Sequence, residues 1–260
     1  TNTPINVEIK DDKSCPRYAG VSISGIKIAP SPNWLKKRLT AIGLNPINNV
    51  VDITNYVLHE TGQPIHAFDT TAIKGRQIII QKLDEKTKFI TLDEVERELS
   101  SEDLMICNSK GEGMCIAGVF GGLNSGVNDN TSDIFLESAY FNPISIRKTA
   151  KRHGLNTDAS FRFERGADPN IVIYALKRAA LLIQEVAGGS ISSIITDIYP
   201  NPISNCEVNL LYDKIDRVIG EKLDRKIIQS ILIDLEIKIL NSTKEKLKLS
   251  IPTFRTDVQR

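Results

Sequence analysis

The chain has 260 residues, of which 41% are hydrophobic and 25% charged, with a net charge of +1 and an isoelectric point near 7.6. This composition is ordinary for a globular protein, and the length exceeds one average domain, so we expect one large and one small domain. The near-zero charge excludes a global attraction for nucleic acid, so any contact with RNA needs a local basic patch.

Cysteine usage and hydropathy indicate a cytoplasmic protein. The four cysteines are scattered, with no CxxC pair and no histidine at zinc-ligand spacing, as is typical of reduced thiols. No apolar run is long enough to cross a bilayer, so no membrane partner is expected. The chain lacks an initiating Met and stops at Arg260 directly after a motif, so we expect an internal piece of a longer protein.

In chain order, the first predicted elements are a strand and a helix. Apolar and polar residues alternate over 18–29, which predicts a half-buried strand. Ser31 and Pro32 predict a helix start, with Ser31 as the cap, and Gly43 predicts its end. The predicted apolar face of this helix contains Trp34, Leu35, Leu39 and Ile42.

The next stretch mixes polar and apolar residues in a way that a plain core or surface helix does not need. A short helix is predicted over 50–60, followed by Gly62, which most easily takes the left-handed stop conformation. A sharp turn then presents His66 between apolar neighbours. Thr54 and Asn55 on the helix and His66 in the turn are therefore predicted to converge on one small pocket.

Six further segments have the pattern of strands and two have that of helices. The predicted strands are 77–83, 88–92, 104–107, 114–117, 134–139 and 194–199; the helices are about 144–153, capped by Asn142, and from Asp168 to near Gly188. Because strands and helices do not alternate regularly, the pattern favours an α+β fold over a doubly wound sheet.

A linker-like segment rich in proline and asparagine, 200–205, marks a domain boundary. We place the domains at 1–200 and 201–260. The second is predicted as a small α/β unit of two helices and short strands, with helices at 213–219 and 224–235 and strands at 208–211, 237–240 and 247–251.

No strong catalytic signature is present. The sequence has no nucleophile elbow, P-loop, metalloprotease helix or dinucleotide fingerprint. The glycine-rich run 117–126 does not match a phosphate-binding pattern, so it is either a tight structural turn or the backbone wall of a pocket.

Several polar residues allow both a structural and a functional interpretation. Glu137 interrupts a strand that is otherwise apolar, and a buried acid is costly unless it is paired or faces a ligand. His66 is either a satisfied structural histidine or a functional one. Thr54 and Asn55 can bond to the backbone of their own helix, and Thr157 can simply cap the next one.

The most basic part of the chain is 147–165. Such a run is either a solvated helix face or a patch that contacts phosphate. Its basic residues are Arg147, Lys148, Lys151, Arg152, His153, Arg162 and Arg165.

Five motifs in order carry a resemblance to a known family. They are CPRYAG from Cys15, NNVVDITNYVLHETGQPIHAFD from Asn48, AGVFGG from Ala117, LESAYF from Leu136 and DASFRFERG from Asp158. On these motifs the chain resembles bacterial phenylalanyl-tRNA synthetase β subunits over nearly its whole length. The matched part is an internal fragment, the B3/B4 editing region followed by the B5 domain.

The resemblance implies hydrolytic editing of tyrosine wrongly attached to tRNA(Phe), within a cytoplasmic α2β2 enzyme that charges tRNA(Phe) with phenylalanine. An apolar pocket rejects a ligand with one added hydroxyl only about a hundredfold, so a second site must recognise that hydroxyl. The implied partners are the α subunit and tRNA(Phe). The implied cofactors of the full enzyme are ATP and Mg²⁺, with none in this fragment.

The resemblance also implies roles for particular residues. Glu137 matches the acid that accepts a hydrogen bond from the tyrosine phenol, and His66 is the catalytic candidate that orients or deprotonates a water, although a tRNA hydroxyl could do the same. The implied substrate-binding residues are Thr54, Asn55, Ala117, Gly118, Ser138, Ala139, Thr157 and Ala159. The implied tRNA contacts are Arg147, Lys148, Lys151 and Arg152.

The last motif, PTFRTD, ends at Asp257 and matches the start of the family's magnesium segment. One carboxylate does not hold Mg²⁺ well, so the shared site is expected to be incomplete here and the C-terminal edge of the second domain truncated. That domain resembles a DNA-binding helical motif, but its cations are matched by nearby acids. The alternative function is a non-catalytic scaffold that binds the α subunit or nucleic acid.

Overall fold

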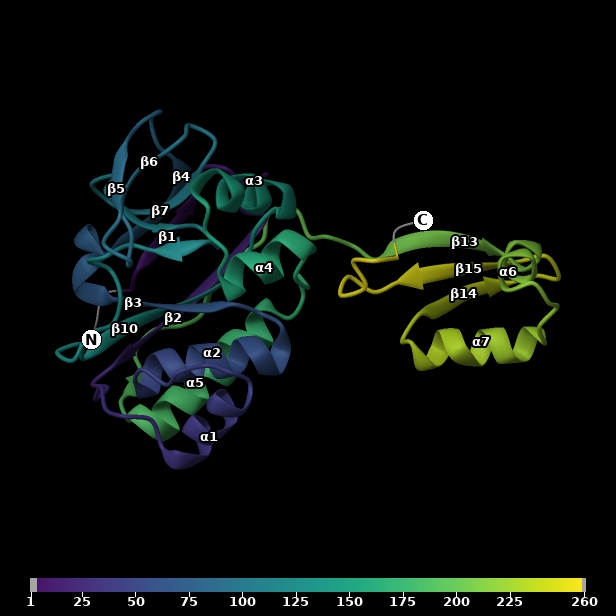
Figure 1. Ribbon diagram of the computed structural model, residues 1–260, viewed down its shortest axis with the longest axis horizontal. Coiled ribbons are helices and arrows are strands. Elements are labelled where there is room, and N and C mark those ends of the chain that lie inside the picture. Colours follow the sequence, from purple (N-terminus) through teal and green to yellow (C-terminus); the bar gives the residue numbers. More distant parts are fainter. Residues whose placement is uncertain (1–3, 259–260) are drawn as a thin grey trace. The chain divides into compact units, whose positions relative to one another are not determined.

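The computed structural model describes residues 4–258, which fall into two compact units that divide between Asn201 and Pro202. The boundary predicted from the sequence lies one residue earlier. Helices and strands are mixed without regular alternation, so the predicted α+β fold class is confirmed (Figure 1). Within the described residues, no helix combines the length and apolar character that a membrane span requires.

The centre of the first unit is an antiparallel ladder. β10 (Asp133–Tyr140) runs between β2 (Arg17–Ser24) and β3 (Ile65–Asp69), and the short strands β11 (Ser190–Ile191) and β12 (Thr196–Ile198) pair with the other edge of β2. The register places Glu137 opposite Gly20 on one side and opposite His66 on the other. Directly opposite residues share a face of the sheet, so Glu137 and His66 project to the same side.

Each face of this ladder packs against a different layer. On one face, Leu136 and its neighbours form a core with three helices, which gather on one side of the ladder in Figure 1. These helices are α1 (Asn33–Ala41), α2 (Asn49–Thr61) and α5 (Val172–Ala187). On the other face, Phe68 and Phe135 belong to a second core shared with a further sheet and two helices, α3 (Pro143–His153) and α4 (Asp158–Arg165).

The second sheet of this unit has the order β1-β4-β7-β8-β9, with β1 and β4 parallel and the other pairs antiparallel. Its strands are β1 (Asn6–Ile9), β4 (Gln77–Lys82), β7 (Leu104–Asn108), β8 (Gly113–Ile116) and β9 (Phe120–Gly121). A separate hairpin consists of β5 (Lys88–Ile90) and β6 (Glu96–Glu98), and two 3-10 turns, η1 (Thr70–Ala72) and η2 (Lys74–Arg76), follow β3. The pairing predicted for 104–107 and 114–117 is confirmed.

Helix ends show how far local sequence determines structure. α2 ends at Gly62 with a left-handed φ of 77°, and Asn142 caps α3, both as predicted. The cap predicted at Ser31 is wrong, because its hydroxyl donates to the buried Asp52 and Pro32 takes the cap position without a side-chain bond. The start predicted for α5 at Asp168 is also too early, because that carboxylate caps a short turn, accepting from the backbone of Asn170.

The apolar face predicted for α1 is half right. Leu35 and Leu39 are buried in the helical core, whereas Trp34 is 37% and Ile42 53% exposed. The predicted strand over 18–29 is also shorter than expected, since β2 ends at Ser24 and Gly25 takes a positive φ of 75°.

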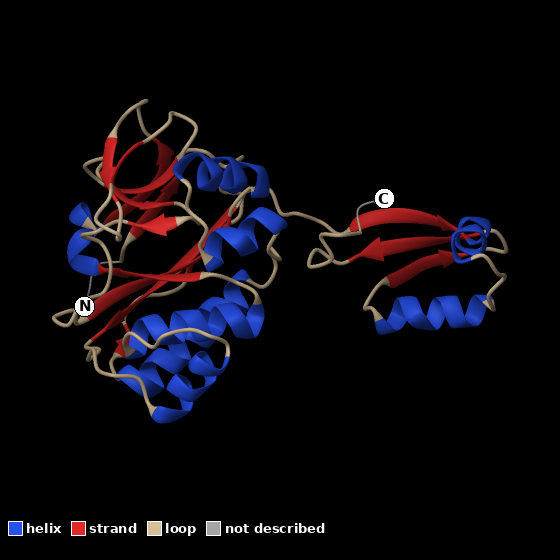
Figure 2. Ribbon diagram, viewed as in Figure 1, coloured by secondary structure: helices blue, strands red, loops and turns tan. Residues whose placement is uncertain are grey.

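The second unit is a three-stranded antiparallel sheet with two helices (Figure 2). Its elements are β13 (Cys206–Leu211), α6 (Tyr212–Ile219), α7 (Arg225–Asp234), β14 (Lys238–Ser242) and β15 (Lys246–Ile251), with β15 in the middle. Tyr212, Ile228 and Leu247 belong to its small core. The predicted helices and strands of this unit are all present, with ends shifted by one or two residues.

Gly118 and Gly62 form a matched pair for a stability test. Both have left-handed φ values, 67° and 77°, but a Cβ on Gly118 would lie 2.7–3.0 Å from Phe141, Ile146 and Phe163, whereas Gly62 has open space. Gly62→Ala should cost about 1–2 kcal/mol of backbone strain. Gly118→Ala should cost about 1–3 kcal/mol more, from overpacking. Urea unfolding followed by the fluorescence of Trp34, the single tryptophan, measures the difference; equal losses would contradict the predicted clash.

Candidate substrate-binding site

A cavity of about 440 Å³ opens on the face of the central ladder that carries Glu137. Its walls come from α2, β3, residues 118–126 after β8 (the glycine segment), β10 and the start of α4, which are far apart in the sequence. The lining is mostly apolar, with a few polar groups, as in typical small-molecule sites. The predicted site residues that line it are Thr54, Asn55, His66, Gly118, Glu137, Thr157 and Ala159.

Glu137 is the most unusual group in this cavity. Its side chain is nearly buried, and Oε2 accepts a hydrogen bond of 2.9 Å from the hydroxyl of Tyr18. Burial raises its pKa from 4.5 to about 8, against the opposing effect of the Tyr18 hydrogen bond. Within the described part of the chain, no lysine or arginine pairs with this carboxyl. Glu137 is therefore a mainly neutral acid at pH 7 that faces a cavity.

His66 lies directly across from Glu137 on the neighbouring strand. The predicted turn around His66 is wrong, because residues 65–69 form β3, an edge strand that pairs with β10. Its Nε2 is buried without a hydrogen-bond partner among the described residues, and its ring meets Phe68 edge-on at 4.3 Å between centroids. Burial lowers its pKa from 6.5 to about 4, so the imidazole is neutral at pH 7.

The smaller polar residues mainly shape the cavity wall. The Thr54 hydroxyl donates to the carbonyl of Val51 in its own helix, at 2.7 Å, as the structural interpretation anticipated. Thr157 caps α4 and also donates to the carbonyl of Val119, at 2.8 Å, which ties the start of α4 to the glycine segment. Ala159 follows in the first turn of α4, where a larger side chain would narrow the cavity.

Three residues assigned to the site from the sequence do not line the cavity. The side chain of Ser138 points to the helical face of the ladder and donates to the carbonyl of Val172, at 2.9 Å, so only its backbone is left for the wall that the resemblance implies. Ala139 is buried, and its carbonyl accepts from Gln63, at 2.8 Å. Ala117 is buried one position before the cavity wall begins at Gly118.

Sequence reasoning missed two residues near the acid. Tyr18 reaches Glu137 across the ladder, and Cys115 lines the cavity from β8. Burial raises the pKa of the Cys115 thiol well above its ordinary value, so it is protonated and a poor nucleophile. Alternation along β2 could have placed Tyr18 and Gly20 on one face, but the pairing of β2 with β10 is not visible in the sequence.

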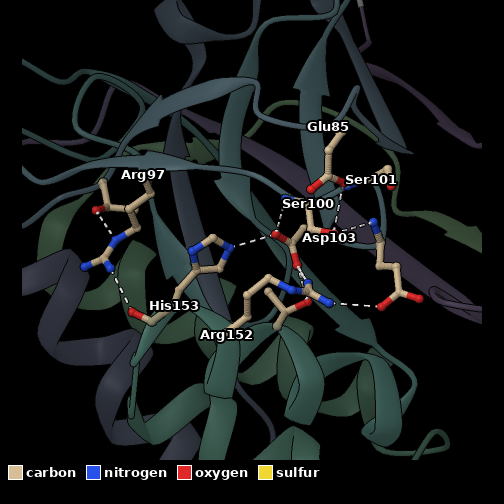
Figure 3. Close-up of polar contacts among 10 residues, drawn as sticks. Glu85, Arg97, Ser100, Ser101, Asp103, Arg152 and His153 are labelled. Carbon is tan, nitrogen blue, oxygen red and sulfur yellow. Dashed lines mark hydrogen bonds and ion pairs between the residues drawn. The ribbon is translucent and has the colours of Figure 1, made fainter.

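The predicted tRNA-contacting residues lie on α3, but one of them is already engaged. Figure 3 shows Arg152 and His153 converging on Asp103, which is fully buried. Burial opposes ionisation of Asp103, but hydrogen bonds led by that of His153 hold its pKa below the usual value. Arg152 also pairs with Glu102, at 2.9 Å. Arg152 therefore fastens α3 to the strand layer.

The remaining cations on α3 are Arg147, Lys148 and Lys151, all exposed. Among the described residues, none of the three forms an ion pair. Their positive charges are therefore not neutralised by an acidic side chain of the described residues.

The predicted metal ligand Asp257 pairs with Arg255, with two contacts of 3.0 Å. The part of the chain that the structure describes contains no group of three acidic, histidine or cysteine side chains that could hold a metal ion. The residues present do not by themselves fit a Mg²⁺ site.

Comparisons with known proteins agree with the two-unit organisation. The family model described as B3/4 domain matches residues 14–188, and that described as tRNA synthetase B5 domain matches 208–260. The chain is 55% identical over 256 residues to the phenylalanine–tRNA ligase β subunit of Bacteroides fragilis and 43% identical over 260 residues to that of Bdellovibrio bacteriovorus.

These alignments cover 98% and 100% of this chain but 31% and 32% of the relatives. The chain thus spans about a third of the length of the curated relatives it matches. A solved N-terminal fragment of the phenylalanyl-tRNA synthetase β subunit from Pyrococcus horikoshii aligns with 100% of this chain and 72% of its own length, at 15% identity and a TM-score of 0.49.

The raised pKa of Glu137 predicts a specific pH dependence of stability. Between pH 4.5 and about 8 the folded chain keeps a proton that the unfolded chain releases, so this group lowers the free energy of unfolding as pH rises, by up to about 1.4 kcal/mol per pH unit. Glu137→Gln keeps the shape but cannot ionise. Its stability relative to the native chain, measured by urea unfolding from pH 5 to 9, should increase with pH and level off above 8.

His66→Gln is the matched control, because burial shifts the pKa of His66 in the opposite direction to that of Glu137 and so reverses the pH dependence of stability. The lowered pKa of His66 destabilises the native chain as pH falls from 6.5 towards 4, so this variant should gain relative stability only on the acid side. A pH-independent difference for Glu137→Gln would contradict the burial of an ionisable acid at this position.

The buried Asp103 predicts a large loss of stability when its carboxylate is removed. Asp103→Ala leaves Arg152 and His153 without their shared partner and should cost about 3 kcal/mol or more, as when one half of a buried ion pair is deleted. Glu102→Ala removes only an exposed contact to the same arginine and should cost about 0–1 kcal/mol. Trp34 fluorescence in urea compares the two; similar losses would refute the central role of Asp103.

Proposed function

The chain belongs to the family of phenylalanine–tRNA ligase β subunits, of which it carries the B3/4 and B5 domains, and from this membership we propose that its cavity hydrolyses tyrosine from mischarged tRNA(Phe). The observation that carries the proposal is Glu137, an acid without a basic partner that faces a mostly apolar cavity. Such a group distinguishes two aromatic side chains that differ by one hydroxyl.

The energetic argument for selectivity follows from burial. A tyrosine side chain in the cavity gives its phenol a partner in Glu137, whereas phenylalanine leaves the acid facing a C–H edge and cut off from water. An unpaired buried polar group costs about 1–3 kcal/mol, which corresponds to roughly 5- to 150-fold discrimination. The selectivity of this cavity multiplies the modest selectivity for phenylalanine over tyrosine that an apolar aminoacylation site achieves.

We propose that the hydrolytic step uses a positioned water. Of the nucleophilic side chains in the cavity wall, Cys115 is held protonated and the Thr54 hydroxyl is bound to its own helix. His66 is neutral, and its buried Nε2 is suited to hold a water near the ester. An aminoacyl ester is already activated, so orientation of that water supplies much of the acceleration.

The proposal extends to the longer protein. We propose that it acts in the cytoplasm with an α subunit in an α2β2 enzyme, which charges tRNA(Phe) using ATP and Mg²⁺, with Asp257 as one ligand of a Mg²⁺ site completed by residues outside this chain. Arg147, Lys148 and Lys151 on α3 would contact the tRNA backbone, since they are exposed cations beside α4, which borders the cavity.

Deacylation assays on the assembled enzyme test the proposal. The native enzyme should hydrolyse Tyr-tRNA(Phe) much faster than Phe-tRNA(Phe). Glu137→Ala should reduce this preference roughly 5- to 150-fold, because the phenol loses its partner. His66→Ala should slow hydrolysis of Tyr-tRNA(Phe) by about 100-fold if the imidazole acts on the water, and less if a tRNA hydroxyl shares that task.

Glu96→Ala on the exposed strand β6 is the matched control and should change neither quantity. If the native enzyme hydrolyses neither substrate, the editing proposal fails and the scaffold function becomes the better account. If it edits but Glu137→Ala keeps full tyrosine preference, recognition by this acid is refuted.

A further inference from the structure

We propose that Tyr18 is a positioning residue for specificity, holding one oxygen of the Glu137 carboxyl so that the other is presented to the phenol of the substrate. This inference rests on the proposed function of the cavity and adds a residue to its recognition machinery. Tyr18 does not line the cavity itself, so it acts only through Glu137.

The contact between the two side chains is isolated and well defined. Tyr18 is fully buried on β2, and its hydroxyl donates to Oε2 of Glu137 at 2.9 Å. No other hydrogen bond to this carboxyl occurs in the described part of the chain, so Oε1 has no protein partner while Glu137 lines the cavity. The carboxyl thus has one oxygen occupied and one available.

The register explains why Tyr18 can reach the acid. Gly20, directly opposite Glu137, has no side chain, and a Cβ there would lie 2.1 Å from the Phe135 ring. Tyr18, two residues earlier on the same face, is the diagonal neighbour of Glu137, and an aromatic side chain spans that distance. The Phe135 ring fills the place of the missing Gly20 side chain, and Tyr18 reaches the carboxyl from the diagonal position.

The surrounding titratable groups do not compete with this contact. Besides Tyr18, Glu137 is near Cys15 before β2, Cys115 on β8 and His66 on β3. Burial, followed by the charge of the Glu137 carboxyl, raises the pKa of both thiols and of the Tyr18 phenol. Burial lowers the pKa of His66. All four are neutral near pH 7, so Tyr18 remains a donor throughout.

The chemistry of the pair has a consequence for selectivity. A carboxylate has lone pairs for several donors, so one phenol from the protein and one from the substrate can bind together. The Tyr18 bond lowers the pKa of Glu137, which favours the ionised form, and an ionised acceptor binds a phenol more strongly than a neutral one. Removing the Tyr18 hydroxyl should therefore weaken tyrosine recognition at neutral pH and restore it only at higher pH.

The test measures kcat/KM for deacylation of Tyr-tRNA(Phe) and Phe-tRNA(Phe) by the assembled enzyme from pH 6 to 9. Tyr18→Phe should lower the tyrosine preference about 5- to 30-fold at pH 7. The pH at which the tyrosine preference increases should shift to a more alkaline value in this variant. The kcat/KM for Phe-tRNA(Phe) should stay within about twofold of the native value. In a Glu137→Ala background, Tyr18→Phe should change the preference less than twofold, because the two residues act as one unit.

Tyr140→Phe is the matched control, since it makes the same chemical change on β10 without touching Glu137. It should leave the preference and its pH profile unchanged. Equal slowing of both substrates by Tyr18→Phe, in both backgrounds, would show a merely structural role and overturn the inference. An unchanged preference and pH profile would overturn it too.

A binding assay separates this inference from the proposed function. 4-Methylphenol and toluene differ by one hydroxyl, and NMR titration of this chain with each probe needs no hydrolysis and no tRNA. The native chain should bind 4-methylphenol more tightly, and Tyr18→Phe should reduce that margin, even if the enzyme proves unable to deacylate tRNA. No margin in the native chain, or an equal margin in the variant, would refute the role of Tyr18.

Discussion

A carboxyl group placed in the middle of a sheet loses its hydration, and neighbouring groups must compensate for that loss. The central ladder of this chain compensates Glu137 only in part. It supplies a single neutral donor, Tyr18, and the pKa of the acid stays near 8. Two residues earlier on the same face the chain places Phe135, which is fully compatible with the core. An apolar side chain at 137 would avoid this cost, whereas Glu137 places a carboxyl oxygen without a protein partner beside the cavity.

The rest of the first unit places the Glu137 carboxyl at the cavity. Alternation along β10 directs one set of side chains to α1, α2 and α5, where packing is continuous, and directs Glu137 to the opposite side. There Gly118 and Gly121 line the cavity together with the apolar side chains of Val119, Phe120 and Phe163. The glycine segment approaches closely, and the bond from Thr157 to Val119 fixes the start of α4 against it. The buried Asp103 fastens α3 to the strands, so the layer that carries this wall is held by an ion-paired cluster.

Features set by short motifs could be read from the sequence more often than those set by distant contacts; the cap expected at Ser31 failed because its hydroxyl bonds to Asp52, 21 residues away. Gly62 and Asn142 act through their own helices, so their roles follow from short motifs. The sequence also singled out Glu137, because an acidic residue within an otherwise apolar strand is rare. The pairing of β10 with β2 and β3 was not visible in the sequence, so the opposition of His66 and Glu137 and the reach of Tyr18 emerge only from the structure.

The most direct measurement is a structure of this chain bound to a tyrosyl adenosine in which an amide replaces the hydrolysable ester. The account predicts the aromatic ring inside the cavity, with the phenol oxygen within about 3 Å of Glu137 Oε1 while Tyr18 keeps its bond to Oε2. A ring bound outside the cavity, or a phenol paired elsewhere with Oε1 left without a partner, would contradict recognition of tyrosine by this acid.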